Sequence, residues 1–305
     1  MSLGMTFFSI FIFPGLLYAL PAGWFMVWLQ RKTEARLQKR LGPPFFQPFF
    51  DFVKLLYKNS VFQPGLNGIL MTFYPILASA ALIGALSLLP VFSNRQGFTG
   101  DLVLLVALLE IPSISLVLAG FTSQSIFGAI GSIREAVLSI TYNFSFLLAM
   151  VVLALDAKTL QLSILSESPL TLARGIALIA ILLCLPAKLH LNPFSQANAE
   201  QEIYTGSLTE YSGIQLALWE LAHSLEWVAL TGLVASLVLP RTGVWYLDVF
   251  LFLITSFILV VLLAAISAGT ARVKIDQAVS FYVRWGLIAG IAALIVALLS
   301  PGIGL

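Results

Sequence analysis

The feature that most constrains this chain is a series of apolar runs. Each is long enough to cross the roughly 30 Å hydrocarbon core of a membrane as a helix. Only 10% of the residues are charged and the mean hydropathy is +0.99, which leaves too little charge for a water-facing surface. We therefore predict an all-α polytopic membrane protein with about eight transmembrane helices, forming a single integral membrane domain over residues 1–305. The runs fall near residues 7–29, 67–90, 102–120, 136–155, 172–187, 213–239, 246–269 and 282–300.

The basic residues are divided unevenly between the two sides of such a bundle. Alternating the loops puts twelve on one side and leaves Arg95, Lys158, Arg174 and Arg241 on the other. By the positive-inside rule the richer side is cytoplasmic. An even number of spans then places both termini on the outer side of the cell's inner membrane. The cytoplasmic loops are expected at about residues 30–66, 121–135, 188–212 and 270–281.

The first of these loops shows helical periodicity after Gly42-Pro43-Pro44. An apolar row runs from Phe49 to Leu56, and Asp51, Lys54 and Lys58 lie largely on another face. This pattern predicts an amphipathic helix on the cytoplasmic membrane surface. Its polar face is available to a neighbouring protein or to a polar tunnel, although topology alone accounts for most of the charge.

The third cytoplasmic loop, residues 188–212, is too polar to span a membrane. It carries Glu200, Glu202 and Glu210 with no basic residue between them. Three carboxylates this close repel one another, so burial would raise the pKa of some of them and let them exchange protons near neutral pH. In a solvated loop they are ordinary surface charges, and the charge pattern favours neither alternative.

Acidic residues also occur inside the apolar runs. Glu110 lies in the third run, and Glu220, His223 and Glu226 fall within about a 120° sector of the sixth helix. Ionisable groups within a span normally face a protein interior or a hydrated cavity and mark an ion path. Glu220 is close enough to a helix end to reach the membrane surface. Glu226 is near the middle, so we expect it either to be protonated in the resting state or to face a hydrated pocket shared with His223, which Trp227 helps to close towards lipid.

Several kinds of chemistry are absent from the sequence. Cys184 is the only cysteine, which excludes a disulfide within the chain, a cysteine-bound iron–sulfur cluster and a thiolate zinc site. His190 and His223 form no convincing haem or metal motif. Any redox centre is therefore expected in other subunits.

Four segments carry a family resemblance. Together they resemble the membrane subunit shared by respiratory complex I and energy-converting membrane-bound NiFe hydrogenases, and the likeness extends over nearly the whole chain. The short stretch from Gly42-Pro43-Pro44 to Gln47-Pro48 is similar to the hydrogenase and formate hydrogenlyase branch. The segments are ARLQKRLGPPFFQPFFDFVKLL (35–56), GFTSQSIFGAIGSIREA (120–136), NPFSQANAEQEIYTGSLTEYSG (192–213) and RVKIDQ (272–277).

The resemblance implies a non-redox subunit that docks peripheral redox subunits and couples their electron transfer to proton or sodium movement. The implied partners are a hydrogenase-like large subunit, an iron–sulfur small subunit and antiporter-like membrane subunits, with no nucleic acid. Iron–sulfur clusters and a NiFe centre or quinone are expected in those partners or at their interface. Residues implied in docking are Arg36, Arg40, Gln47, Asp51, Lys54, Arg134, Glu135, Lys274 and Asp276.

The proposed ion-coupling residues have two origins. The resemblance implies Glu200, Glu202 and Glu210, whereas placement in apolar helices suggests a rerouted path through Glu110, Glu220, His223 and Glu226. Such a path matters because the chain departs from the family's acidic pattern, and an amide cannot exchange a proton at physiological pH. The departures are Gln30, Asn143, Lys188, Ser195 and Asn198.

Three functions stay open on the sequence. The chain could be the coupling subunit of a redox-driven ion pump. It could also be a divergent architectural subunit with weak or no coupling, which the missing carboxylates favour. The third alternative is a stand-alone transporter or channel.

Overall fold

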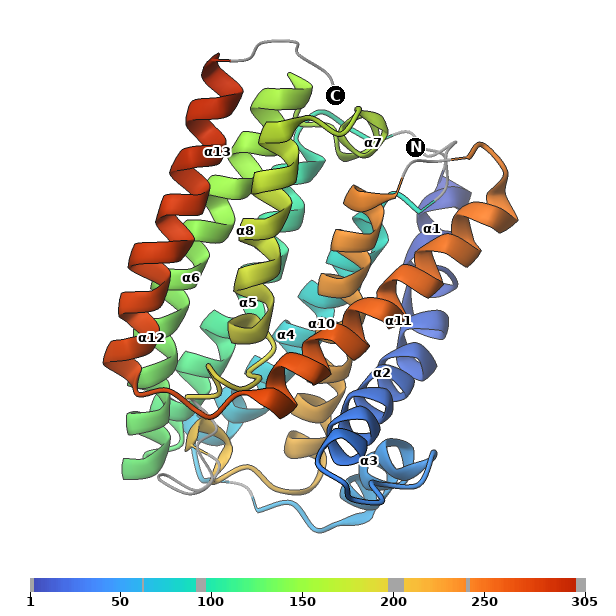
Figure 1. Cartoon of the computed structure of the whole chain (residues 1–305). Helices are drawn as coiled ribbons and strands as arrows, with labels where there is room; N and C mark the ends of the chain where they lie inside the picture. Colours follow the sequence, from blue (N-terminus) through green and yellow to red (C-terminus); the bar gives the residue numbers. More distant parts are fainter. Residues whose placement is uncertain (1–2, 62, 92–96, 197–205, 240–241, 300–305) are drawn as a thin grey trace.

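The computed structural model describes residues 3–61, 63–91, 97–196, 206–239 and 242–299. Within these ranges the chain forms helices and connecting loops without a β-strand, which confirms the all-α prediction. The membrane-crossing elements are drawn in Figure 1. They are α1 (Leu3–Phe11) with α2 (Leu16–Leu37), α4 (Leu66–Leu88), α5 (Asp101–Thr122), α6 (Ile126–Ala157), α8 (Leu172–Lys188), α10 (Gly213–Val238), α11 (Trp245–Gly269), and α12 (Ile275–Phe281), which continues through a π-turn, Tyr282–Gly286, into α13 (Leu287–Leu299).

Seven of these helical segments in the described ranges are long and apolar enough to cross a membrane. The eighth, α8, has 17 residues, giving it a length of about 26 Å, and it lies beside α6 and α13 (Figure 1). Counting α8 gives the number of crossings that the sequence predicts. A polytopic membrane bundle is therefore confirmed.

Helix α10 forms the centre of the bundle. In the most apolar 18-residue stretch of α10, 83% of the residues are buried. The corresponding share is at most 50% in each of the other six candidate spans. It packs against α2, α4 and α11. The glycine at position 23 allows α2 and α10 to approach closely. A Cβ atom at Gly23 would lie only 2.5 Å from the carbonyl oxygen of Ser224 on α10. Most side chains of α10 are thus held in the interior of the protein.

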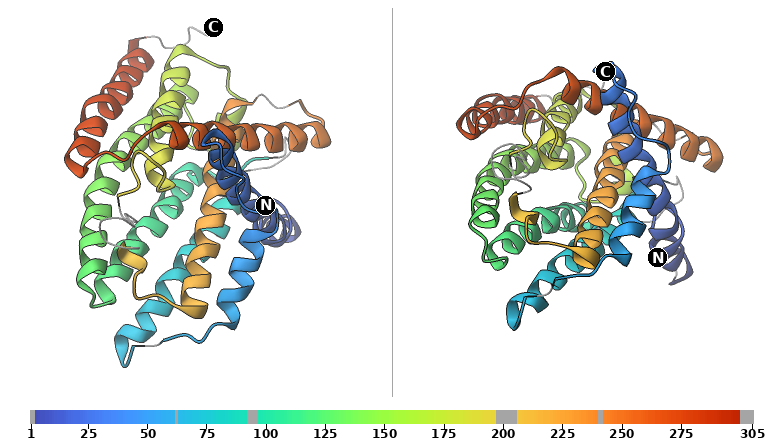
Figure 2. Two further views of the ribbon diagram at one scale, coloured as in Figure 1. Left: turned by 60° about the horizontal axis from the view of Figure 1, so that its bottom comes forward. Right: turned by 90° about the horizontal axis from the view of Figure 1, so that it is seen from below.

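The predicted amphipathic helix is α3, Gln47–Tyr57, at one end of the bundle (Figures 1 and 2). Its apolar side is anchored by Trp24 of α2, whose ring centre lies 5.2 Å from that of Phe49 and 5.5 Å from that of Phe52. Arg31 of α2 reaches within 3.7 Å of Asp51. Ring packing and an exposed ion pair therefore fix α3 across the end of α2.

The expected loop at 121–135 is wrong in its extent. Helix α6 begins at Ile126, directly after Ser125, and continues to Ala157, so most of that loop is helical. No proline interrupts the segment, and its two glycines allow close packing without ending the helix. Helices also occupy parts of the other expected loops, since α2 continues to Leu37 and α12 covers Ile275–Phe281.

Segments from three expected loops meet at the end of the bundle that carries α3, here called the α3 end. The amide of Val61 donates to Ser212 Oγ at 3.0 Å, and the amide of Ile214 donates to Ser60 Oγ at 3.0 Å. The amide of Val273 donates to the carbonyl of Pro193 at 3.1 Å. The opposite end carries the short helix α7 (Leu162–Glu167) and is called the α7 end.

The contact between α2 and α10 gives a stability prediction. Gly23→Ala should destabilise the protein by about 1–3 kcal/mol, because the methyl group meets backbone that cannot move aside easily. The control is Gly175→Ala in α8, where the added methyl meets open space. This control should be neutral or stabilising by up to about 1 kcal/mol. Thermal unfolding in detergent measures both; equal melting temperatures for the two variants would contradict the tight contact.

Candidate functional site

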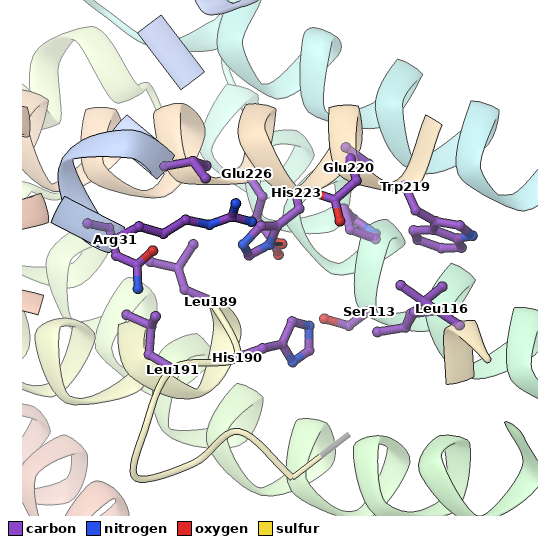
Figure 3. A pocket seen from close by; sticks show the side chains of 15 residues that line it. Arg31, Ser113, Leu116, Leu189, His190, Leu191, Trp219, Glu220, His223 and Glu226 are labelled. Atoms are coloured by element: carbon purple, nitrogen blue, oxygen red, sulfur yellow. Dashed lines mark ion pairs between the residues drawn. The ribbon is translucent and has the colours of Figure 1, made fainter. Parts of the chain in front are cut away.

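A polar cavity of about 370 Å³ lies between α2, α5, α10 and the turn that follows α8 (Figure 3). Helix α5 contributes Pro112 and Ser113, and the turn contributes His190. Proline at position 112 has no backbone N–H, so the helix loses one internal hydrogen bond beside the cavity. A polar hollow within the bundle is the type of site in which ionisable side chains can remain inside a membrane protein.

The three α10 residues singled out by their spacing all line this cavity, as predicted for His223 and Glu226. Nδ1 of His223 is 3.9 Å from Oε2 of Glu226, whose side chain is only 9% exposed. Glu220 is exposed, which agrees with the alternative of a charge near the helix end. The helical spacing therefore identifies which groups share the cavity, and their depth separates Glu226 from Glu220.

The expected role of Trp227 is wrong. Its side chain is fully buried, so it does not close the pocket towards lipid. Instead, its indole Nε1 donates a hydrogen bond to Nε2 of His223 at 3.2 Å. Because Nε2 accepts this bond, a neutral His223 carries its proton on Nδ1, the nitrogen that faces Glu226. Trp227 thus sets both the orientation and the tautomer of the imidazole.

A second glutamate–histidine pair reaches the same cavity through its histidine. Helix α8 ends at Lys188, and His190 adopts a left-handed backbone conformation with φ of 53° that turns the chain. Its Nδ1 lies 3.5 Å from Oε2 of Glu135 on α6. Figure 3 shows His190 and Ser113 pointing into the space opposite His223 and Glu226.

Hydroxyl groups extend this second pair. The Tyr142 hydroxyl donates to Oε1 of Glu135 at 3.3 Å and lies 3.1 Å from the Ser113 hydroxyl. Glu135 is completely buried and interacts electrostatically with Glu226. Its expected place on a docking surface is therefore wrong: the carboxylate points into the bundle. Two carboxylates, two imidazoles and two hydroxyls form a set that can take up, hold and pass protons.

Glu110 forms an ion pair next to this group, since its partner Lys188 lies 5.3 Å from the ring centre of Tyr142. Its Oε1 is 2.7 Å from Nζ of Lys188, whose side chain is 1% exposed, and its Oε2 accepts a hydrogen bond from Asn143. The Lys188 ammonium also lies 4.8 Å from the ring centre of Phe146. Two of the departures from the family's acidic pattern, Asn143 and Lys188, thus satisfy both oxygens of Glu110. The sequence identified each of the three residues but gave no sign that they meet.

The remaining predicted residues lie at the α3 end. Gln47 donates to Oδ1 of Asp51 at 2.7 Å, which orients that carboxylate within α3. Arg134 is partly buried. The exposed members of the predicted docking set are Arg36, Arg40, Lys54, Lys274 and Asp276.

The predicted acidic cluster is only partly described. Glu210 is exposed, which agrees for this residue with the alternative of an ordinary surface charge. Glu200 and Glu202, like Asn198, lie outside the described residues. Sequence reasoning missed His190, Ser113 and Tyr142 as members of the site. A lone histidine directly after an apolar helix was the available signal, but its partner Glu135 comes from a different helix.

Known proteins are similar to this chain over most of its length. Residues 10–298 match the NADH dehydrogenase family. Hydrogenase-4 component C of Escherichia coli (strain K12) is 33% identical over 222 residues, which cover 70% of this chain and 69% of that protein. A subunit of the NADH-quinone oxidoreductase of Syntrophobacter fumaroxidans (strain DSM 10017 / MPOB) is 28% identical over 278 residues, covering 83% of each chain.

A solved structure has the same fold. One chain of the membrane-bound sulfane sulfur reductase (MBS), an archaeal respiratory membrane complex, superposes with a TM-score of 0.86 at 26% identity, covering 96% of this chain and 99% of that one. The bundle and these matches thus define a multi-pass membrane protein of the kind found in complex I-like and hydrogenase-type respiratory complexes. The chain belongs to the NADH dehydrogenase family, which confirms the resemblance carried by the four segments.

The buried ion pair gives a second prediction. Lys188→Met should destabilise the protein by about 3–5 kcal/mol, because it leaves the Glu110 carboxylate without its counter-charge. Adding Glu110→Leu should recover most of that loss, since replacing both partners by apolar groups removes the uncompensated charge. Thermal unfolding of the two single variants and the double variant measures the coupling. Additive losses would show that the two groups do not stabilise each other.

Proposed function

We propose that this chain is the membrane subunit that links peripheral redox subunits, docked at its α3 end, to proton or sodium movement through its interior. The observation that carries the proposal is that two glutamate–histidine pairs, Glu226–His223 and Glu135–His190, meet at one polar cavity, which is lined by Glu226 and both histidines. Buried acids are costly and mark ion paths in membrane proteins. The relatives are subunits of respiratory membrane complexes, which supports a role that depends on partners.

The chemistry of the cavity suits proton transfer. Histidine changes charge close to neutral pH, and each imidazole here faces a carboxylate that can take or give a proton. The Ser113 and Tyr142 hydroxyls connect the cavity to Glu135 by hydrogen bonds. A change of charge on a partner docked nearby would alter the electrostatic balance between Glu135 and Glu226. In this proposal the cavity residues respond by taking up or releasing a proton.

Redox chemistry is assigned to the partners. With a single buried cysteine, this chain has no cysteine set for an iron–sulfur cluster. We therefore place iron–sulfur clusters and a NiFe centre or quinone in the docked subunits or at their interface. Exposed basic side chains at the α3 end, including Arg36 and Arg40, provide the docking surface for a hydrogenase-like large subunit and an iron–sulfur small subunit. Antiporter-like membrane subunits would pack against the exposed helix faces.

A second candidate function has its own supporting observation. Glu110, Lys188 and Asn143 form a closed set in which the carboxylate already has a cation and an amide donor. An acid held this way is a poor carrier of exchanging protons. It supports the alternative of an architectural subunit that docks partners with weak or no coupling.

Replacing the cavity acids separates the two functions. Glu226→Gln and Glu135→Gln should each lower the number of ions moved per electron on the order of tenfold or more, because an amide cannot carry the proton. Electron transfer through the complex should continue. The matched control is Glu167→Gln, which neutralises an exposed acid in α7 at the opposite end of the bundle and should pump like the parent. Ion uptake by vesicles containing the intact complex is the measurement; parental pumping by both cavity variants would favour the architectural function.

A second experiment tests the docking surface at the α3 end. The double change Arg36→Ala with Arg40→Ala should release peripheral subunits while leaving the chain inserted, since most of the topology-determining charges remain. Lys158→Ala, which removes a basic residue at the α7 end, is the control and should retain them. Co-purification is compared with and without added anionic lipid, because lipid can also bind positive charge. Full retention of the partners after the double change would contradict this docking surface.

A further inference from the structure

An apolar groove of about 690 Å³ lies on the outside of the bundle between α5 and α6. Val103 and Val106 of α5 form one wall, and Leu147 and Val151 of α6 form the other. Val103 is 58% exposed and Val151 is 50% exposed. The groove is lined by the start of α5 and the end of α6, so it lies in the half of the bundle nearest the α7 end, where its exposed apolar walls would face hydrocarbon.

The mouth of the groove has a fixed shape. The amide of Leu102 donates to the carbonyl of Leu160 at 3.2 Å, and the amide of Leu162 donates to Oδ1 of the buried Asp101 at 2.6 Å. Nε2 of Gln161 donates to the carbonyl of Gly97 at 3.0 Å. These three bonds join the start of α5 to the segment after α6. The rim is therefore preformed before any ligand binds.

Lys158 stands at this mouth together with Thr99 and Thr159. It ends α6 with a left-handed backbone conformation, φ of 52°, and is exposed. Within the described part of the chain its ammonium has no ion pair or side-chain hydrogen bond. A lysine at this position also complements the negative end of the α6 dipole. That role does not explain the apolar groove beside it.

The neighbouring charges are already engaged. Arg174, also near the α7 end, is buried and donates to the carbonyls of Leu165 and Leu237, each at 2.7 Å. Asp156 accepts a hydrogen bond from the Thr171 hydroxyl at 2.9 Å, and Asp101 is bonded to the Leu162 amide. Lys158 is thus left as an exposed cation where an apolar groove meets the membrane surface.

We propose that this groove binds an acyl chain of an anionic phospholipid, with the lipid phosphate held by Lys158 and the two threonine hydroxyls. The apolar walls match an acyl chain in direction and chemistry, and the cation at the rim matches the headgroup. A partner's transmembrane helix would cover the same walls but would leave Lys158 without a counter-charge. A phosphate pairs with it, so anionic lipid fits both parts of the site.

The test measures protection of a cysteine placed in the groove. Val151→Cys is introduced into the full chain, purified with the subunits that stay bound, and labelled with a membrane-permeant maleimide. The native Cys184 is fully buried, so it contributes little to the labelling. Phosphatidylglycerol should slow labelling at a concentration at least about fivefold lower than the concentration of phosphatidylcholine that has the same effect. This ratio corresponds to about 1 kcal/mol of binding free energy, the contribution of one basic residue at an anionic lipid.

Charge variants identify the headgroup contact. Lys158→Glu in the Val151→Cys background should abolish the preference for phosphatidylglycerol, and Lys158→Arg should keep it. Lys39→Glu, the same charge reversal at an exposed residue that follows α2 on the opposite end and shares the left-handed backbone conformation of Lys158, should leave it unchanged. Unfolding temperatures confirm that each variant is folded.

Two outcomes would overturn the proposal. Equal protection by the two lipids, unaffected by Lys158→Glu, would mean that the groove does not recognise the phosphate charge. A cysteine that stays unreactive after lipid is removed from the complex, and becomes reactive only when partner subunits dissociate, would mean that a partner helix occupies the groove.

Discussion

The cost of placing charge inside a membrane protein governs the arrangement of this molecule. Within the bilayer, water does not solvate a carboxylate, so each buried charged group needs a partner from the protein. Glu110 has Lys188 and Asn143, Glu135 has His190 and Tyr142, and Glu226 has His223. Lys188 and Asn143 come from α8 and α6, and His190 comes from the turn after α8, whereas Tyr142 and His223 lie on the same helices as their glutamates. The positions of α5, α6 and α8 are therefore tied to the electrostatic needs of a few side chains as well as to apolar packing.

Much of the fold followed from the sequence, because transmembrane helices and surface helices leave strong patterns. Uninterrupted apolar runs gave the bundle, and the periodicity after Gly42-Pro43-Pro44 gave α3. The extent of α6 was missed, since a helix that continues beyond an apolar run has no hydrophobic signal at that end. Helical spacing also grouped Glu220, His223 and Glu226 on one face. The pairing of Glu135 with His190 was beyond such reasoning, because it depends on how α6 packs against the end of α8.

The departures from the family's acidic pattern acquire different meanings once their neighbours are known. Lys188 and Asn143 occupy positions beside the same carboxylate, so the two changes act together and leave a satisfied interior. Ser195 differs, because its hydroxyl accepts a hydrogen bond from Nε of Arg272 at 3.0 Å and supplies no negative charge there. One group of changes substitutes a neutralised ion pair for acids within the bundle. The change at Ser195 weakens the electrostatic contact with Arg272 between two loops at the α3 end.

The bond from Trp227 to His223 limits the order of events in the cavity. With Nε2 accepting from the indole and Nδ1 carrying the proton, the neutral imidazole presents a donor to Glu226 and has no lone pair free to receive a second proton. His223 becomes a base only after its ring rotates or Trp227 withdraws. If the cavity moves protons as proposed, transfer at this position would therefore wait on the rotation of one imidazole that is bonded to a fully buried tryptophan.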